Sequence, residues 1–553
     1  MDPISCFYSL CFVPPEATGS TAKLFGFSEF LASLALLVVI FTVSDTRYKF
    51  RISIAPIPLY GITFFIISLT GFGSLISDFW IGQNWWVLKT ELNIRVIFQA
   101  VLGFLFLSCF ILWVYFAFIN PPRFSKRNSE KYIKSLYLYI LKGNNGELAV
   151  IADELGYSAY DIVKNAGRKG KLKIINEVAN DILLLIANRK FCFVLVNESP
   201  RTAVDIFISM TEQGIYDIPI NQFSARISEE AILNKESIIY HEEDGYHSGL
   251  MGYIQQWSKA VYGDPYLIDS LSKNHLSPLN IDYRVLYKLD ADQWNAYGRV
   301  ISIYFDGLVN GSARSMLSSA FNKALDDFKM CTSELYKIDK LEDDAVESML
   351  LDKARVSIDF LKDIFMILSK ANIKINDRCE GFKIKYPMDI YSSLANLMFN
   401  IIFDASKLKS PLFVTWHVQN NIVWDGFFNE IESSKHYRIT RSILTRLIYN
   451  ELKEVKDNAN FKNIRILGML LNVLGLKEES IFIKSKDVKF LKRFALKIAK
   501  ENYLSLIDNR PEVAEHMLGG GIGYDAETLS LVKIYPRGIR KIAPKDILLL
   551  NDS

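Results

Sequence analysis

Three long apolar runs lie near the N-terminus of the chain, over residues 24–43, 52–77 and 96–120. The first run contains one charged residue, Glu29, near its start, and the other two contain none. Because an α-helix rises about 1.5 Å per residue, about 20 apolar residues are needed to cross the hydrocarbon core of a bilayer. The pattern therefore predicts a membrane α-helical domain of three transmembrane helices at residues 24–120.

The basic residues that flank these runs predict an orientation, because lysine and arginine are retained on the cytoplasmic side of a membrane. The connection between the second and third runs has only Lys89 and Arg95. The other flanks hold Arg47, Lys49, Arg51, Arg123, Lys126, Arg127, Lys131 and Lys134. We expect a multi-pass protein of the plasma membrane or bacterial inner membrane, with a short extracytoplasmic N-terminus (residues 1–23) and everything after Pro121 in the cytoplasm.

The basic stretch after the third run is expected to lie along the inner leaflet, where each lysine or arginine contributes on the order of 1 kcal/mol of attraction to anionic lipid. The residues expected to contact such lipids are Arg123, Lys126, Arg127 and Lys131. The N-terminus before the first run carries Asp2, Glu16 and a single lysine. This composition argues against a secretory signal peptide, which begins with a basic region.

No ionisable residue lies in the middle of any run, so an ion or proton path has no obvious marker. The second run contains Pro56, Pro58, Gly61, Gly71 and Gly73, a composition that permits a kink or close helix packing. These features favour a self-associating anchor, and a conduction path is the alternative.

The cytoplasmic body is predicted to begin with a basic juxtamembrane segment, residues 121–173. Within it Ala152, Gly156 and Ile162 have the spacing of a helix-turn-helix unit, which the sequence resembles over about 20 residues. A tight helical hairpin explains the same spacing. Because this segment follows the membrane run closely, we do not expect a nucleic-acid partner.

The remainder of the body is predicted to be mainly helical and partly α/β. Residues 191–196 form a short apolar run typical of a strand, and Ser199-Pro200 then begins a helix. These signals predict a small mixed α/β subdomain at residues 174–290. Apolar stripes with a helical period follow, and they predict a mainly helical cytoplasmic domain at residues 291–553.

Overall composition changes this picture little. The chain has 553 residues, which suggests about three domains, and its formal net charge of +3 is too small to indicate nucleic-acid binding. The six cysteines include no CxxC pair, as expected in a reducing compartment. Cys6 and Cys11 are the only close pair, and they are candidates for a disulfide if the N-terminus lies outside.

The densest set of potential catalytic groups lies between His241 and His247, with Glu243 between them. A histidine and a carboxylate can transfer protons, and such residues can bind a divalent metal. The spacing matches neither a helical HExxH motif nor an EF-hand loop, so neither a metal site nor a cofactor is predicted. A polar turn after a strand explains the same residues, and we prefer that interpretation.

A glycine-rich stretch near the C-terminus offers a second candidate site. The backbone N–H groups of Gly519, Gly521 and Gly523 are candidates for binding a phosphate. Neither phosphate-binding glycine motif is present, so a flexible connection is preferred. The tail that follows has basic residues suited to lipid headgroups or another subunit, although a solvated strand face is preferred: Lys533, Arg537, Arg540, Lys541 and Lys545.

No serine elbow, kinase motif set, cysteine–histidine signature or zinc framework is present, which disfavours an enzyme. The leading hypothesis is a membrane-tethered sensor, effector or scaffold whose cytoplasmic body binds a protein or a small ligand, with a homo-oligomer or a cytoplasmic protein as partner. The first alternative is an oligomeric channel or membrane-permeabilising toxic or defence effector gated by that body. The second alternative is a membrane-anchored hydrolase or nuclease that uses the histidine cluster.

Overall fold

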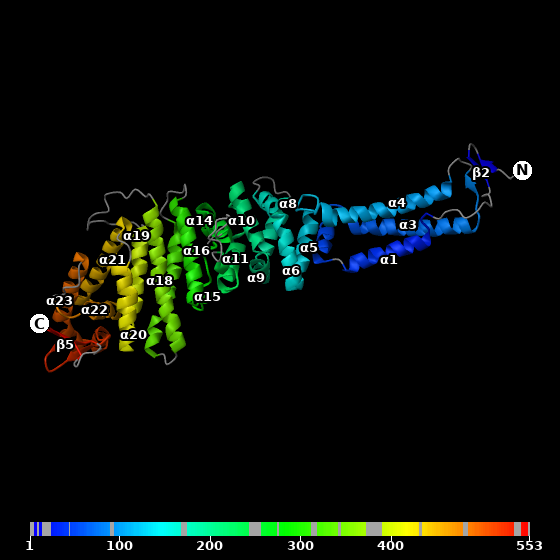
Figure 1. The fold of residues 1–553 in the computed structure, drawn as a ribbon. Coiled ribbons are helices and arrows are strands. Elements are labelled where there is room, and N and C mark those ends of the chain that lie inside the picture. The colour runs from blue at the N-terminus through cyan, green and yellow to red at the C-terminus, as the bar shows by residue number, and fades with distance from the viewer. Residues whose placement is uncertain are drawn as a thin grey trace. The chain divides into compact units, whose positions relative to one another are not determined.

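The computed structural model divides into two compact units, Met1–Pro219 and Ile220–Ser553, and each is described by itself (Figure 1). Helices make up most of the described chain. The residues described are 5–7, 10–13, 24–43, 45–88, 93–167, 174–242, 256–273, 276–310, 318–340, 344–371, 390–430, 434–478, 485–535 and 543–550.

The N-terminal unit opens with long apolar helices (Figure 1). Helix α3 packs against both α1 and α4, and α4 continues into the wider turns of a π-helix, η1. A short helix, α2, precedes α3, and three short antiparallel strands pair in the order β1-β2-β3. The bounds are β1 Ser5–Phe7, β2 Leu10–Val13, α1 Phe27–Val43, α2 Thr46–Ser53, α3 Leu59–Gly82, β3 Val87–Leu88, α4 Ile94–Val114 and η1 Tyr115–Ile119.

Two of the described helices are long and apolar enough to cross a membrane, Leu59–Gly82 and Ile94–Ile119. The second run, residues 52–77, is divided between two helices. Pro56 and Pro58 lack the N–H that a helix interior needs, so α2 ends at Ser53 and α3 begins after Pro58. Helix α1 has 17 residues, which is shorter than a typical span. Two of the three predicted runs thus contain a helix that is long and apolar enough to cross a membrane.

The start of α1 is tied to the other two helices by polar groups. The Asp78 carboxylate of α3 accepts a hydrogen bond of 3.0 Å from the N–H of Phe27, and the Gln99 side chain of α4 accepts one of 3.1 Å from the N–H of Leu24. Glu29 accepts from the N–H of Gly26. Acceptors at this position satisfy the free N–H groups of a helix start. The one charged residue of the first run therefore lies at the end of its helix.

The outward faces of these helices are apolar. Phe64 and Phe72 of α3 are 75% and 71% exposed, and Phe104 of α4 is 68% exposed. Glycines allow the inward faces to approach closely, because a Cβ at Gly73 would lie 2.7 Å from the side chain of Leu102. Many of the apolar side chains of α3 and α4 are therefore not buried against the described residues.

Six further helices complete the N-terminal unit, and α10 packs against both α6 and α7. Helices α6 and α7 form the predicted hairpin, with Tyr157 and Ser158 between them. A Cβ at Gly156 would lie 2.9 Å from the hydroxyl of Thr202, so this glycine allows α10 to pack closely. Residues 168–173, which follow the hairpin and are rich in basic residues, lie outside the described residues. The bounds are α5 Ser129–Lys142, α6 Asn145–Gly156, α7 Ala159–Ala166, α8 Ile174–Leu185, α9 Arg189–Glu198 and α10 Pro200–Gln213.

The predicted strand at residues 191–196 is wrong, because these residues lie in α9. The run looks continuous because α9 is buried on most sides, including Phe191, Val194 and Val196. A short apolar run has no periodicity that separates a buried helix from a strand. The described residues between 174 and 290 form helices and their connections, and no strand is found among them.

The C-terminal unit consists of helices followed by a small sheet. Helix α16 packs on α18, α19 packs on α21 and α22, and α23 packs on α21 and α22. The helices are α11 Asn221–Leu233, α12 Ile238–His241, α13 Gln256–Tyr262, α14 Pro265–Ser272, α15 Tyr283–Leu286, α16 Ala291–Asn310, α17 Ser319–Phe328, η2 Lys329–Thr332, η3 Leu335–Lys340, α18 Asp344–Lys370, α19 Ile390–Ser406, α20 Leu412–Trp416, η5 His417–Trp424, η6 Gly426–Glu430, α21 Lys435–Lys453, η7 Glu454–Lys456, α22 Phe461–Leu474, α23 Lys486–Asn509, α24 Pro511–Ala514 and η8 Glu515–Met517.

The strands β4 Ile522–Asp525, β5 Ser530–Ile534 and β6 Lys545–Leu549 pair antiparallel in that order. The predicted apolar stripe of α16 is confirmed as core, because Tyr297, Tyr304 and Phe305 are fully buried. Aromatic rings from α16, α17 and α18 meet there, with Phe328 and Phe360 4.2 Å apart between centroids.

Candidate functional site

A buried ion pair joins the base of the apolar helices to the helices that follow them. The guanidinium of Arg51 in α2 donates hydrogen bonds of 2.8 Å and 2.7 Å to the two carboxylate oxygens of Glu154 in α6. Arg51 is 8% exposed and Glu154 is 5% exposed. The hydrogen bonds to Glu154 raise the pKa of Arg51 despite its burial, so the guanidinium stays charged.

The same arginine donates a hydrogen bond to a backbone carbonyl of η1 that has no N–H donor within η1. Arg51 Nη1 donates a hydrogen bond of 2.8 Å to the carbonyl of Ala117 in η1. A helix would supply that carbonyl with an N–H from four or five residues further on, and those residues are Pro121 and Pro122. Proline has no N–H. Arg51 therefore completes the end of η1.

Side chains of the juxtamembrane segment satisfy the carbonyls of the α2–α3 connection in the same way. Lys131 Nζ donates to the carbonyls of Ala55 and Ile57, at 3.0 Å and 3.1 Å. The side-chain amide of Asn128 donates to the carbonyl of Ile54 at 2.8 Å. Prolines at positions 56 and 58 interrupt the helix here, so the carbonyls of Ile54 and Ala55 need side-chain donors, whereas the Ile57 carbonyl also accepts from the N–H of Leu59.

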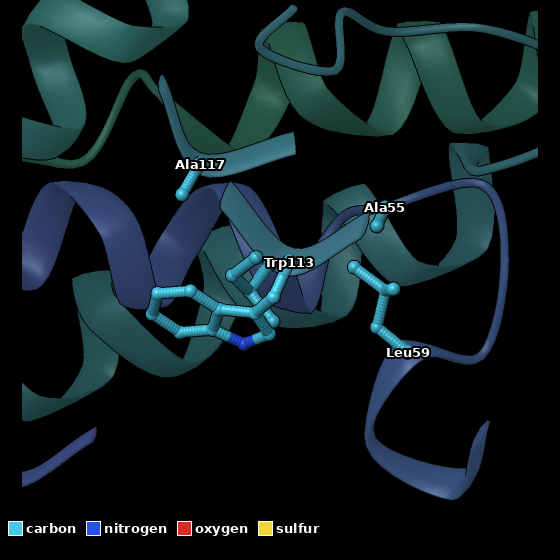
Figure 2. Packing of buried hydrophobic residues seen from close by; sticks show 5 residues of the cluster. Ala55, Leu59, Trp113 and Ala117 are labelled. Carbon is cyan, nitrogen blue, oxygen red and sulfur yellow. The ribbon is translucent and has the colours of Figure 1, made fainter. Parts of the chain in front are cut away.

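An apolar cluster fills the space between these polar contacts. Figure 2 shows Trp113 of α4 lying among Ala117, Ala55 and Leu59, and all four are at most 5% exposed. Beside it, the Phe50 ring of α2 meets the Tyr132 ring of α5 edge to face at 5.6 Å. Burial raises the pKa of Tyr132 well above its usual range, so the phenol stays neutral.

These contacts define the membrane-proximal junction, which consists of Arg51, Glu154, Ala117, Lys131 and the Trp113 cluster. It connects α2, α3 and η1 to α5 and α6 through paired charge, hydrogen bonds and packing. An element held by all three has few alternative positions.

The structure changes the expectation for one of the four lipid-binding candidates. Lys131 is half-buried and bonded to backbone carbonyls, so its ammonium belongs to the junction. Arg123, Lys126 and Arg127 are exposed. Sequence reasoning also missed Glu154, because the acid lies in the helix-turn-helix-like hairpin and its partner is 103 positions away. The available signal in the sequence was an acidic residue on an otherwise apolar face of the predicted helix.

The histidine cluster is only partly described. His241 ends α12, whereas Glu243 and His247 lie outside the described residues. The neighbouring Glu242 accepts hydrogen bonds from the N–H groups of Trp257 and Ser258, at 2.6 Å and 3.0 Å. It thereby caps the start of α13. Among the residues that the structure describes, no group of three metal-binding side chains is brought together.

The three glycines of the second candidate have different positions. Gly519 and Gly521 belong to the turn between η8 and β4, where Gly521 has φ of +88°, a conformation that favours glycine. Gly523 lies within β4. A Cβ at Gly519 would lie 3.8 Å from Lys409, so this glycine is close to a basic residue.

Lys533 of β5 is buried, which corrects the expected solvated strand face. It is 1% exposed, and its Nζ donates to the carbonyl of Asn472 and lies 4.6 Å and 4.5 Å from the ring centroids of Trp416 and Tyr535. Burial lowers the pKa of Lys533 to about 7. Tyr535 in turn donates to Asp546 of β6 at 2.8 Å. Lys545 is exposed, and residues 537, 540 and 541 lie outside the described part of the chain.

No family model matches this chain, and comparison with curated proteins and with solved structures gives no significant match. The chemistry of the sites must therefore come from their own residues.

Proposed function

We propose that this protein is a membrane-tethered sensor or effector, in which three N-terminal helices cross the bilayer and the body that follows acts at its cytoplasmic face. The observation that carries the proposal is the membrane-proximal junction. Its buried Arg51–Glu154 pair and the bond from Arg51 to Ala117 tie the ends of the apolar helices to α6. A passive anchor needs only a flexible linker, whereas a fixed junction suits the transmission of a signal.

Insertion into a membrane is supported by the outward faces of α3 and α4. Leaving large apolar side chains in water costs on the order of 25 cal/mol per Å² of surface, and lipid removes that cost. Helix α1 has the same character, since Leu31 and Leu36 are exposed although α1 packs on α3. Its 17 residues span about 26 Å, and bilayer thinning accommodates such a mismatch at modest cost. We therefore include α1 as the third span.

The proposed orientation rests on the residues at the two ends of the apolar helices. Arg47 and Arg51 belong to α2 and precede α3, and exposed Arg123 and Lys126 follow η1. At the other end, after α3, exposed Trp85 lies beside Arg95, which donates to the Trp85 carbonyl at 2.7 Å. Positive charge favours the cytoplasmic side and tryptophan favours the interface. Arg123, Lys126 and Arg127 are then the proposed contacts with anionic lipid.

The polar groups of α3 and α4 support an anchor over a channel. Gln99 donates to the hydroxyl of Ser77 at 3.2 Å, and Thr70 donates to the carbonyl of Ile66 in its own helix at 2.7 Å. A Cβ at Gly71 would lie 2.9 Å from the Phe30 ring of α1, so these helices pack without space for water along that line. The polar side chains thus form hydrogen bonds with a neighbouring helix or with their own helix.

Labelling from one side of the membrane tests the proposal. Single cysteines replace exposed Gln83, after α3, and exposed Lys142, at the end of α5, in a chain whose Cys6, Cys11 and Cys379 are changed to serine. We expect a membrane-impermeant maleimide to label Q83C in intact cells and K142C only after permeabilisation. Labelling of K142C in intact cells, or release of the chain by alkaline extraction, would contradict the proposal.

A further inference from the structure

Three nitrogen-bearing side chains meet in the C-terminal unit away from the membrane-proximal junction. They are Lys409, in the connection between α19 and α20, Arg465 in α22 and His516 in η8. Lys409 Nζ lies 2.9 Å from His516 Nδ1, and Arg465 Nη2 lies 3.0 Å from His516 Nε2. Two separate segments of the chain thus direct hydrogen-bond donors at an imidazole that a third segment carries.

The ring cannot satisfy both neighbours when they are cationic. A neutral imidazole has one N–H donor and one acceptor nitrogen, whereas an ammonium and a guanidinium only donate. In one of the two contacts, the imidazole N–H therefore faces the N–H of Lys409 or Arg465, and no acceptor lies between them. A protonated ring would place a third positive charge in the same cluster. Either arrangement lacks an acceptor that carries negative charge.

The protein itself supplies little negative charge to this cluster. Within the described ranges, neither Lys409 nor Arg465 forms an ion pair, and Arg465 Nε is buried without a hydrogen-bond partner. The nearest acids have other roles or positions. Asp339 of η3 accepts from the backbone N–H groups of Lys409 and Ser410, at 2.9 Å and 3.1 Å, and Glu515 is exposed.

The electrostatics agree with this geometry. Burial first, and then the charges of Lys409 and Arg465, lower the pKa of His516. Burial and the charge of Arg465 likewise lower the pKa of Lys409. Glu515 and Asp339 act in the opposite direction, but the net effect lowers both pKa values, and a bound anion would relieve the effects of burial and of the neighbouring cations.

The surroundings fit a small ligand. Lys409, Arg465 and His516 are all partly exposed, so solvent reaches the cluster. The Phe461 ring at the start of α22 lies 4.9 Å from the His516 ring and is half exposed. Gly519, one of the glycines expected to approach a phosphate, lies against Lys409 on the chain segment that follows His516.

We propose that Lys409, Arg465 and His516 form a binding site for a phosphate-type oxyanion, carried by a small phosphorylated ligand of the body. Three convergent donors of this kind match the several acceptor oxygens of a phosphate group. The proposal names a ligand class for the sensor or effector proposed above. It rests on the C-terminal unit alone, and thus its failure is distinguishable from a failure of the membrane topology.

Equilibrium dialysis of the full chain in detergent, with inorganic pyrophosphate as the probe, tests the site. We expect saturable binding at one site per chain, competed by sulfate. Arg465→Gln and His516→Gln should each lower the association constant by about tenfold or more, because each removes a charge-assisted or buried donor. Arg284→Gln removes one positive charge from an exposed arginine that pairs with Asp282, and it should leave binding unchanged.

Circular dichroism checks that each variant is folded. If Arg465→Gln fails to fold, Lys409→Gln carries the same expectation, because its side chain is more peripheral than a residue of α22. Absence of saturable pyrophosphate binding by the wild-type chain would overturn the proposal. So would wild-type affinity in folded variants of two of the three residues.

Discussion

The guanidinium of Arg51 and the carboxylate of Glu154 form two parallel hydrogen bonds across 103 positions of sequence. Arg51 precedes the second apolar helix, and Glu154 lies in the helical hairpin that follows the third. The pair therefore joins the segment that precedes α3 to a segment that follows α4 and η1 in the sequence. Its third partner, the carbonyl of Ala117, belongs to the helix end between them.

The first prediction concerns this pair. Glu154→Gln should lower the free energy of unfolding by about 3–5 kcal/mol, because it leaves a buried arginine without its counter-charge. Asp153→Asn is the matched control. It removes the same charge one residue earlier, from a side chain that is 49% exposed, and should cost less than about 1 kcal/mol. Chemical denaturation of the detergent-solubilised chain measures both, and equal losses would contradict the expected difference.

Lys131 gives the second prediction. Lys131→Met should destabilise the chain by about 1–3 kcal/mol even in a detergent without anionic lipid, because the Ala55 carbonyl loses its donor and the Ile57 carbonyl loses one of its two donors. Lys126→Met, which changes an exposed lysine of the same segment, should change stability by less than about 0.5 kcal/mol. If both variants behave like the wild type in this detergent, Lys131 has no structural role.

The third prediction uses the N-terminal hairpin to test orientation. Cys6 and Cys11 are register partners in β1 and β2. Partners in an antiparallel pair have Cα atoms about 4.5–5.5 Å apart, within the roughly 4.4–6.8 Å that a disulfide spans. With the N-terminus outside, we expect the two cysteines to resist alkylation until a reductant is added. Mass spectrometry of the N-terminal peptide decides this, and two free thiols in cells would argue for a cytoplasmic N-terminus.

The fourth prediction is a pH dependence set by Lys533. Its folded pKa of about 7 lies below the unfolded value, so the unfolded chain binds an extra proton between about pH 7 and pH 10. Stability should therefore rise with pH there, by up to about 1.4 kcal/mol per pH unit, and the cost of burying the cation is fully present below about pH 7.

Lys533→Met removes that effect. The variant should exceed the wild type in stability by the largest amount below about pH 7, and the difference should shrink toward pH 9. Lys545→Met, at an exposed position of the neighbouring strand, is the control and should show no such trend. Denaturation curves at three pH values measure it. A difference that is constant with pH would mean that Lys533 titrates normally.

The fifth prediction concerns the packing of α22 on η8. A Cβ at Gly468 would lie 2.6 Å from the carbonyl oxygen of Met517, a backbone atom that cannot move alone. Gly468→Ala should therefore cost about 1–3 kcal/mol, although alanine favours a helix. Gly523→Ala meets nothing within 4 Å and should be near neutral. Thermal unfolding compares the two, and a neutral Gly468→Ala would show that η8 moves freely.

The helices that sequence predicted best are those with long or strictly periodic patterns. The third apolar run, residues 96–120, corresponds to Ile94–Ile119, and the stripe of α16 is buried as expected. The strand at residues 191–196 was wrong, because an apolar run of that length suits a buried helix equally well. The pairing of Arg51 with Glu154 left no local signal, because an ion pair between distant segments depends on how the helices pack.

The same reason explains why the sequence predicted little of the Lys409–Arg465–His516 cluster and of the surroundings of Lys533. Glycines near residue 519 suggested a phosphate from composition alone, but Lys409 and Arg465 are distant in sequence and meet His516 only in the fold. Lys533 looked like a solvated base because β5 alternates weakly. Its burial depends on Trp416 and Asn472, which come from helices far earlier in the chain.

The prolines after η1 determine which N-terminal fragments of the chain keep Arg51 paired. Pro121 and Pro122 leave the Ala117 carbonyl dependent on Arg51, and Arg51 depends on Glu154 in turn. A fragment that stops at residue 120 would keep the arginine and lose its counter-charge. The smallest N-terminal fragment with this charge paired must therefore extend through α6.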